Sequence, residues 1–188
     1  HHDKLKAPAT NSALAVGGRE KMENPLNTIH EKLKANFSNE IISAEQRYDF
    51  PVFTVKREKI FDMIKFLKED SELDFGFLTT MRALHYPDNK GQEMGMMYQL
   101  HNLQKNWRVR LKIFFPIADP VVPTITPLFA TANWMERQEY DFFGVLFKGH
   151  PNLKRILNMD EMNYFPMRKE YPLEDLQRED KDDSMFGR

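Results

Sequence analysis

The feature that most constrains the fold is a pair of strand-like segments in the middle of the chain, residues 95–103 and 107–116. In the second segment, apolar residues alternate with basic ones. The apolar positions are Trp107, Val109, Leu111 and Ile113, and the basic positions are Arg108, Arg110 and Lys112. Successive side chains of a strand point to opposite faces. The two segments therefore predict a β-hairpin, turning around residues 104–106, whose second strand has one apolar face and one basic face.

Helical periodicity appears in two earlier segments, and a third helix is indicated by its ends. The first two helices have apolar residues at helical spacing, at Leu26, Ile29, Leu33 and Phe37 and again at Ile60, Phe61, Ile64 and Leu67. The third helix is predicted to begin with Thr126 as its N-cap and Pro127 in its first turn, and to end near Gly144.

The remaining strand-like segments are less regular. Residues 41–59 are predicted to form extended pieces broken at Pro51, and residues 74–87 to form a strand that ends at Pro87. Residues 117–127 contain several prolines and are predicted to cross the surface as an extended connector. The order of elements predicts an α+β fold: a two-layer domain of a mixed or antiparallel sheet with helices packed on it, plus an extended C-terminal arm.

Three parts of the chain are distinguished by composition. Residues 1–25 lack apolar periodicity and are interpreted as a tag, a linker or a disordered N-terminus. Residues 26–157 are expected to form the α+β domain. Residues 158–188 mix aromatic residues, prolines and charges without periodicity, and they are expected to form an arm that docks to a partner.

The composition also excludes several classes of site. The chain of 188 residues contains no cysteine, so it offers no disulfide and no thiolate for an iron–sulfur cluster or a structural zinc ion. Its formal net charge of -1 gives no general attraction to nucleic acid. No apolar run approaches the roughly 20 residues that a membrane-spanning helix requires. Any electron carriers that act with this chain would therefore belong to other chains.

Residues 133–157 concentrate charged side chains at the end of the third helix. Glu136, Glu139 and Asp141 have the chemistry for general acid–base catalysis or for sharing a metal ion. However, neither glutamate is followed three residues later by a histidine, as a Glu-x-x-His metal motif requires. The i, i+4 spacing instead predicts an ion pair between Arg137 and Asp141.

Two glycines follow the helix. Gly144 and Gly149 have the spacing of a phosphate-binding loop, but His150 and Pro151 stand where such a loop needs Lys and then Ser or Thr. A structural role is predicted instead: a left-handed helix terminus at Gly144, a bend at Gly149 and a hydrogen-bonded corner at His150. The residues by themselves thus predict no nucleophile, cofactor cradle or metal site.

The segment 133–157 closely resembles the signature of the 30-kDa subunit family of respiratory complex I, known in bacteria as the C subunit of NADH-quinone oxidoreductase. The matching positions are Glu136, Arg137, Asp141, Phe142, Phe143, His150, Arg155, Ile156 and Leu157. Gln138 departs from the family, which usually has Glu there. A second family motif is matched at Pro166, Arg168, Lys169, Glu170, Tyr171 and Pro172. Residues 162–165 differ from the family's Trp-Glu-Gly-His, so local packing there is expected to differ.

The resemblance implies a non-catalytic structural and assembly subunit in the peripheral arm of a proton-translocating NADH:quinone oxidoreductase. Its expected partners are the 49-kDa-type subunit, which forms the quinone site, and neighbouring iron–sulfur subunits. NADH, FMN, iron–sulfur clusters and quinone would be bound by other subunits. The chain would reach the membrane only through its partners, on the cytoplasmic face of the bacterial inner membrane or on the matrix side in mitochondria.

Two alternatives stay open at this point. Homologous subunits serve related complexes, namely membrane-bound hydrogenases, coenzyme F420 dehydrogenase and the photosynthetic NDH-type complex, and the sequence does not identify the electron donor. The basic strand beside aromatic residues also raises an RNA-binding module. The aromatic spacing of an RNA-recognition strand is absent, so no nucleic-acid partner is expected.

The resemblance marks the residues expected to form the signature and the partner interface: Glu136, Arg137, Asp141, Gly144, His150, Pro151, Arg155, Arg168 and Lys169. No residue is assigned to catalysis, to a cofactor or to a metal. Four charged members are expected to form one hydrogen-bonded network that becomes partly buried when the partner docks: Arg137, Asp141, His150 and Arg155. Arg168 and Lys169 are expected to contact the partner.

Overall fold

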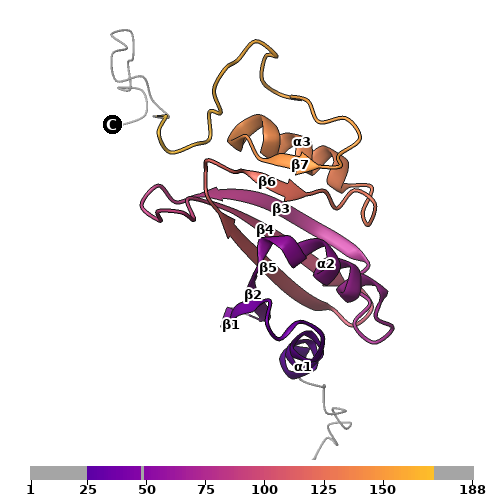
Figure 1. Ribbon diagram of the computed structural model, residues 1–188. Coiled ribbons are helices and arrows are strands. Elements are labelled where there is room, and N and C mark those ends of the chain that lie inside the picture. The colour runs from indigo at the N-terminus through magenta and orange to yellow at the C-terminus, as the bar shows by residue number, and fades with distance from the viewer. Residues whose placement is uncertain (1–24, 48, 172–188) are drawn as a thin grey trace, which may run out of the picture.

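The computed structural model, which describes residues 25–47 and 49–171, is built around one mixed five-stranded sheet (Figure 1). Its strands, in spatial order, are β1 (Ile41–Arg47), β2 (Phe50–Val55), β5 (Trp107–Phe115), β4 (Met94–Asn102) and β3 (Phe77–His85). Neighbouring strands are antiparallel except β2 and β5, which are parallel. The predictions made for residues 1–24 and 172–188 lie outside the described residues.

The predicted hairpin forms the centre of this sheet. β4 and β5 pair along their whole length. On β5, Val109, Leu111 and Ile113 are fully buried, whereas Arg108 is exposed on the opposite face. The predicted division of this strand into an apolar face and a basic face is confirmed.

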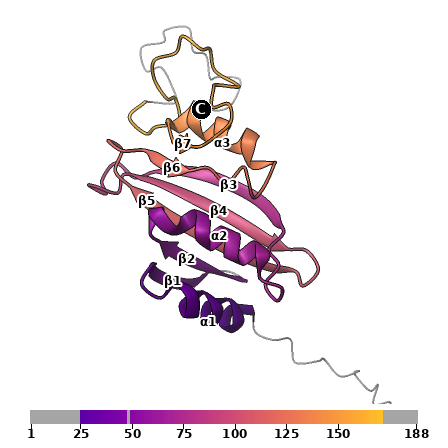
Figure 2. The same ribbon diagram turned by 45° about the vertical axis from the view of Figure 1, so that its right-hand side comes forward.

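Two helices, α1 (Pro25–Phe37) and α2 (Ile60–Glu69), cover the apolar face of the sheet (Figures 1 and 2). A short 3-10 turn, Arg57–Lys59, leads into α2. The two helices are joined by a salt bridge between Lys32 and Asp70 at 2.7 Å. Their apolar periodicity predicts both helices, and both are confirmed.

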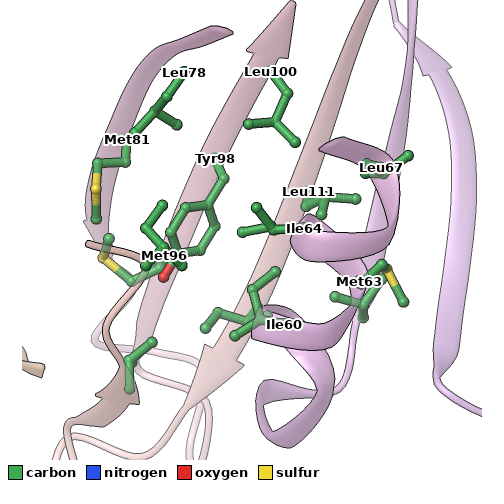
Figure 3. Packing of buried hydrophobic residues seen from close by; sticks show 14 of the residues in the cluster. Ile60, Met63, Ile64, Leu67, Leu78, Met81, Met96, Tyr98, Leu100 and Leu111 are labelled. Atoms are coloured by element: carbon green, nitrogen blue, oxygen red, sulfur yellow. The ribbon is translucent and has the colours of Figure 1, made fainter. Parts of the chain in front are cut away.

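The core lies between α2 and the central strands. Figure 3 shows Ile60 and Ile64 of α2 directed toward Tyr98 and Leu111 of the sheet, and all four side chains are fully buried. Burial of one large apolar side chain stabilises a fold by about 1.5–3 kcal/mol. The α+β class and the two layers are thereby confirmed.

A second, smaller unit lies beyond the β3 edge of the sheet (Figure 1). It consists of the parallel strands β6 (Val121–Pro123) and β7 (Leu146–Lys148) with the helix α3 (Ala132–Phe143) between them. The prediction of a surface connector at residues 117–127 is wrong, because Val122 and Ile125 in this segment are fully buried. Its prolines do not disturb a strand of only three residues whose partner lies on one side.

Helix α3 also begins later than predicted, with Thr131 at its N-cap. Thr126 and Pro127 lie in a turn in which the N–H groups of Leu128 and Phe129 donate to the carbonyl oxygen of Ile125. The predicted end of the helix is confirmed, because Gly144 caps it in the left-handed conformation.

The break between the first two strands lies around residue 49 and not at Pro51, where the sequence predicts it. Pro51 belongs to β2 and stands opposite Gln46 of β1. Pairing of β2 with β5 starts only at Val52. The missing N–H of Pro51 therefore removes no hydrogen bond from the β2–β5 ladder.

The described part of the C-terminal arm, residues 158–171, contains no helix or strand. It lies along the end of α3, where the N–H of Met167 donates to the carbonyl oxygen of Phe142 at 3.1 Å. In the described ranges, no helix is both long and apolar enough to cross a membrane.

Candidate functional site

Helix α3 carries three carboxylates that the fold buries. Its inward face has Ala132, Glu136 and Glu139 at helical spacing, and Asp141 near its end is buried as well. A buried carboxylate is costly unless donors surround it. Each of the three is bound to a different part of the chain, so α3 is the hub that joins the sheet, the β6–β7 unit and the arm.

Asp141 is the most strongly bound of the three. Its side chain accepts hydrogen bonds from the guanidinium of Arg155 at 2.8 Å, from the side-chain amide of Asn158 at 2.9 Å and from backbone N–H groups that include Leu157 at 2.8 Å and Asn158 at 3.0 Å. Burial by itself raises the pKa of Asp141. The donors from Asn158, Leu157 and Arg155 outweigh burial and hold that pKa well below its usual range. Asp141 is therefore an anion that anchors the loop after β7.

Arg155 connects Asp141 to the C-terminal arm. Its guanidinium also donates to the carbonyl oxygens of Met162 at 2.8 Å and Tyr164 at 3.0 Å, and it lies 5.1 Å from the ring centre of Phe165. Arg168 lies over the same ring at 4.7 Å and donates from Nε to the carbonyl oxygen of Phe143 at 2.8 Å. One aromatic ring is thus held by two guanidinium groups at the carboxyl end of α3, where cations are favoured.

Gly144 makes this close approach possible. Its φ of 77° is a conformation that favours glycine. A Cβ at this position would lie 2.5 Å from a ring carbon of Phe165 and 2.7 Å from Arg168 Nη2. Glycine is therefore required here for two separate reasons, backbone conformation and space.

Glu136 binds the segment that precedes α3. It accepts the N–H of Ile125 at 2.7 Å and the hydroxyl of Thr124 at 2.5 Å. Burial raises its pKa to about 7, and the two neutral donors only partly oppose this shift. Glu136 is consequently close to half-protonated at neutral pH, unlike Asp141 on the same helix.

His150 belongs to the Glu136 end of the unit. Its Nδ1 accepts the N–H of Asn152 at 3.0 Å, so Nε2 carries the proton that faces the carbonyl oxygen of Asn133 at 3.1 Å. Nε2 lies 4.0 Å from Oε2 of Glu136. The predicted hydrogen-bonded corner at His150 is confirmed, and Gly149, where a bend was predicted, has a positive φ of 89°.

Glu139 ties α3 to the edge of the sheet. It accepts the backbone N–H of Ala83 on β3 at 2.7 Å and a hydrogen bond from Arg82 at 3.1 Å. Burial raises the pKa of Glu139, and these two donors oppose the shift. A backbone donor on an edge strand is thereby satisfied.

The structure corrects two expectations about the charged network. Asp141 pairs with Arg155 rather than with Arg137, because the Asp141 side chain points into the interior while Arg137 lies outside over Trp134, at 4.9 Å. Arg137 donates instead to the carbonyl oxygens of Lys154 and Arg155, at 3.1 and 3.3 Å. His150 does not join Asp141.

The network is also already buried without a partner, contrary to the expectation that docking would bury it. Asp141 is fully buried in this chain alone, and the Arg155 side chain is only 7% exposed. The reason is that the arm folds back over the helix end and supplies the cover itself.

The other predicted interface residues lie around this corner. Pro151 is exposed in the turn after His150. The backbone N–H of Lys169 donates to Nδ1 of His85 at 3.0 Å, and its ammonium group lies 5.5 Å from the ring centre of Tyr86. Arg168 is mostly covered by its own chain. Whether these residues touch a partner stays a prediction.

The sequence singled out Glu139 only as a possible acid, base or metal ligand, although it occupies a core position of the α3 repeat begun by Ala132. Thr124, Asn158 and Phe165 were not singled out, since the groups that they contact at the site are distant in sequence. Within the described ranges, no group of three or more histidine, aspartate or glutamate side chains is placed to hold a metal ion.

The end of α3 and residues 155–171 form a corner whose outer surface exposes large apolar side chains among charged ones. Leu157 and Met159 are 67% and 70% exposed. Trp134, Tyr164 and Met167 are also exposed to a large extent. The arrangement satisfies its polar groups inside and presents large apolar side chains outside, which suits a binding surface better than a reaction centre.

The comparisons with known proteins agree with this picture. Residues 53–177 match the family described as "Respiratory-chain NADH dehydrogenase, 30 Kd subunit". The C subunit of NADH-quinone oxidoreductase from a Nocardioides species is 41% identical over 64% of this chain and 48% of its own length. The C subunit from Mycobacterium avium is 34% identical over 80% of this chain and 66% of its own. The chain thus spans about half the length of the first of these relatives.

Two solved structures are similar in fold. The trypsin-resistant fragment (1-134) of Nqo5 has a TM-score of 0.59 and 28% identity, covering 69% of this chain and 99% of the fragment. A chain of the archaeal membrane-bound sulfane sulfur reductase has a TM-score of 0.67 and 24% identity, covering 78% and 85%, a likeness that shows the fold alone. Since the family match takes in well over half of the residues, including α3 and its corner, this chain belongs to the 30-kDa subunit family of the respiratory-chain NADH dehydrogenase.

Proposed function

We propose that this chain is a structural and assembly subunit in the peripheral arm of a proton-translocating NADH:quinone oxidoreductase. In this proposal it docks to the quinone-site 49-kDa-type subunit and to neighbouring iron–sulfur subunits. NADH, FMN, iron–sulfur clusters and quinone are then bound by other subunits, and the chain lies peripherally on the cytoplasmic face of the membrane, or on the matrix side in mitochondria. Family membership supports this role, because the relatives carry the name of a subunit of that enzyme.

The docking surface that we propose is the corner formed by the end of α3 and residues 155–171. One observation carries this choice: hydrogen bonds hold the corner from inside, and large apolar side chains are exposed on its outside. The hydrogen bonds of Asp141 and Arg155 hold the backbone, and Leu157 and Met159 project from it. Apolar side chains on a preorganised segment lose little conformational entropy on binding, so they are effective anchors.

The carboxylates of α3 have positioning roles in this proposal. Glu136, Glu139 and Asp141 each accept hydrogen bonds from their own chain. A catalytic acid or base must instead reach a substrate atom. No residue of the chain is therefore assigned a catalytic role.

The experiment compares lysine substitutions at exposed apolar positions. Met159→Lys and Leu157→Lys should each reduce the amount of quinone-site subunit that co-purifies with the tagged chain from mildly solubilised membranes, measured by mass spectrometry. Leu103→Lys is the matched control, because Leu103 is 64% exposed but lies in the turn between β4 and β5. Equal recovery for all three variants would contradict the proposed docking surface.

A subunit of a related complex is the second candidate. The fold shared with a chain of the archaeal sulfane sulfur reductase favours keeping it. Recovery of quinone-site and iron–sulfur subunits without an NADH-binding module would assign the chain to such a complex. Recovery of the chain alone, or with RNA, would contradict both candidates.

A further inference from the structure

The face of the sheet opposite α1 and α2 carries no helix of the described residues (Figures 1 and 2). Strand register places a basic group at its centre. Arg108, Arg110 and Lys112 of β5 stand opposite His101, Gln99 and Met97 of β4. On the other side of β5, Arg110 and Lys112 stand beside Val52 and Thr54 of β2. We name this surface the outer face.

The positive charge of the outer face is not balanced within the described chain. Of the strand residues whose register turns them to this face, the acidic one is Glu45, and it pairs with Arg47 at 3.0 Å. Arg108 is exposed. Lys112 is half-buried, and burial first, then the nearby Arg47 and Arg110, lower its pKa, against a smaller effect of Glu45. The basic side chains of the outer face therefore lie near one another, with too few acidic groups among the described residues of the same face to pair them all.

An unsatisfied donor lies in the middle of this group. Gln99 is 5% exposed, and its Oε1 accepts a hydrogen bond from Arg110 Nε at 2.8 Å. That bond fixes the orientation of the amide, because only the oxygen accepts. The amide nitrogen, Nε2, is buried and has no hydrogen-bond partner in the described chain. Buried donors are rarely left in this state. The described residues hold one other such group, the Tyr98 hydroxyl, but it lies on the helix-covered face, so Gln99 Nε2 is the one of the two that can turn to an acceptor from outside the chain.

We infer that the outer face binds an acidic segment of a partner protein, whose aspartate or glutamate carboxylates pair with Arg108, Arg110 and Lys112 and accept the hydrogen bond from Gln99 Nε2. The chemistry matches, because carboxylate oxygens both neutralise guanidinium and ammonium groups and accept a hydrogen bond from an amide. The three basic residues lie on β5 at the centre of the sheet, whereas the α3 corner lies beyond the β3 edge, so the inference does not depend on which partner the corner binds.

A protein segment suits the outer face better than nucleic acid. Proteins that bind single-stranded nucleic acid combine basic grooves with aromatic rings on which bases stack. The ring of Phe50 is already covered by the guanidinium of Arg110, at 4.8 Å. Phe114 is half-buried and lies 6.0 Å from the ring centre of Tyr86. Among the strand aromatics of this face, Phe77 is the one that is largely exposed, at 45%, and it stands opposite His101. A single exposed ring beside the cations is less than the run of rings on which successive bases stack.

The first test is zero-length carbodiimide cross-linking of the complex captured from membranes with the tagged full chain. This reagent couples an amine to a carboxylate that it touches. We expect Lys112 to be coupled to an aspartate or glutamate of another polypeptide, identified by mass spectrometry. Coupling of Lys112 only to Glu45 of its own chain, or no coupling at all in the intact complex, would overturn the inference.

The second test measures binding to a defined probe, a fluorescein-labelled peptide of alternating glutamate and serine. The Arg108→Gln/Lys112→Gln variant should weaken peptide binding on the order of tenfold, as expected for the loss of two charge pairs, one at an exposed position and one at a half-buried position. The control Lys34→Gln/Lys65→Gln removes the same charge from exposed positions on α1 and α2 and should change affinity by less than about twofold.

Two results of the binding experiment would contradict the inference. One is an equal loss of affinity in the control variant, which would mean that the peptide responds only to net charge. The other is tighter binding of an RNA oligonucleotide of the same charge than of the peptide. If the double variant does not fold, Arg108→Gln alone serves, because this side chain is exposed and supports no buried contact.

Discussion

The two ends of α3 treat a buried carboxylate in opposite ways. Glu136, toward the start of the helix, and Asp141, near its end, are both 0% exposed. The pKa of Glu136 is raised to about 7, whereas the pKa of Asp141 is held well below its usual range. Burial alone would raise both values. The difference must therefore come from the donors that each carboxylate receives.

The donors differ in number and in charge. Glu136 receives a hydroxyl and one backbone N–H. Asp141 receives the guanidinium of Arg155, the amide of Asn158 and several backbone N–H groups of the loop that follows β7. The comparison teaches that the same helix can hold a carboxyl that is about half-protonated at neutral pH at one end and a carboxylate that stays ionised at the other. Only the second can anchor a loop through charge at neutral pH.

The largest expected effect comes from Asp141→Ala. The change leaves the buried Arg155 guanidinium without its anion, and breaking a buried pair from one side costs about 3–5 kcal/mol. We expect about 3 kcal/mol in the free energy of urea unfolding at neutral pH, since Arg155 keeps carbonyl partners at Met162 and Tyr164. Asp160→Ala, which removes an exposed carboxylate from the same arm, should change this free energy by less than about 0.5 kcal/mol.

The pH dependence of the Asp141 effect has a defined sign. Because folding lowers the pKa of Asp141, its carboxylate stabilises the folded state above the ordinary pKa of about 3.9. This stabilisation is lost as the pH falls below that value. The gap in stability between the wild type and Asp141→Ala should therefore narrow below about pH 4. A difference in stability between the two proteins that stays constant below about pH 4 would show that Asp141 acts through packing rather than through charge.

Gly144→Ala tests whether close packing against Phe165 also stabilises the end of α3 at which Asp141 lies. The positive φ alone costs about 1 kcal/mol for a residue with a side chain. The added Cβ would also displace Phe165, so we expect a total of about 2–3 kcal/mol in urea unfolding. Gly91→Ala is the matched control, because Gly91 has a φ of 80° but nothing within 4 Å of its Cβ position. Equal losses for both variants would mean that contact with Phe165 contributes nothing.

Glu136→Gln tests the raised pKa of the carboxylate toward the start of α3. A raised pKa favours the protonated carboxyl in the folded state, so its stabilisation is complete below the ordinary value of about 4.3 and is lost as the pH rises through about 7. The neutral amide removes this loss. The variant should therefore gain on the order of 2 kcal/mol relative to the wild type between pH 5 and pH 8.5, measured by urea unfolding at both values. A difference that does not change with pH would contradict the raised pKa.

Arg137→Gln should have the smallest effect. Arg137 is partly exposed and donates only to the carbonyl oxygens of Lys154 and Arg155. We expect a loss of less than about 1 kcal/mol in the free energy of unfolding. A loss comparable to that of Asp141→Ala would mean that Arg137 and Asp141 act as one unit after all.

Much of the fold could be predicted because its signals are local. The alternation on β5 and the apolar repeat of α2 follow from the periods of strands and helices, which a stretch of about ten residues already displays. Gly144 marked the end of α3 for the same reason, since a left-handed conformation is a property of one residue. The family motif likewise located the corner, because the spacing between its residues is short.

Two of the wrong predictions concern partners distant in sequence. Arg137 was expected to pair with Asp141 because the two are one helical turn apart, yet Arg155 takes that place after the loop folds back. Residues 117–127 were expected on the surface, yet β6 finds a parallel partner in β7 across the whole of α3. Neither the Asp141–Arg155 pair nor the β6–β7 pairing is indicated by residues close together in the sequence.

The sequence by itself determined the classes of element, the two-faced hairpin, the glycine at the helix end and membership of the family. The tertiary structure alone decided which carboxylate stays ionised and which is about half-protonated at neutral pH, and which cations lack a counter-charge. The physical reason is that secondary structure depends on neighbours along the chain, whereas a pKa or an unsatisfied donor depends on every group brought within a few ångströms by folding.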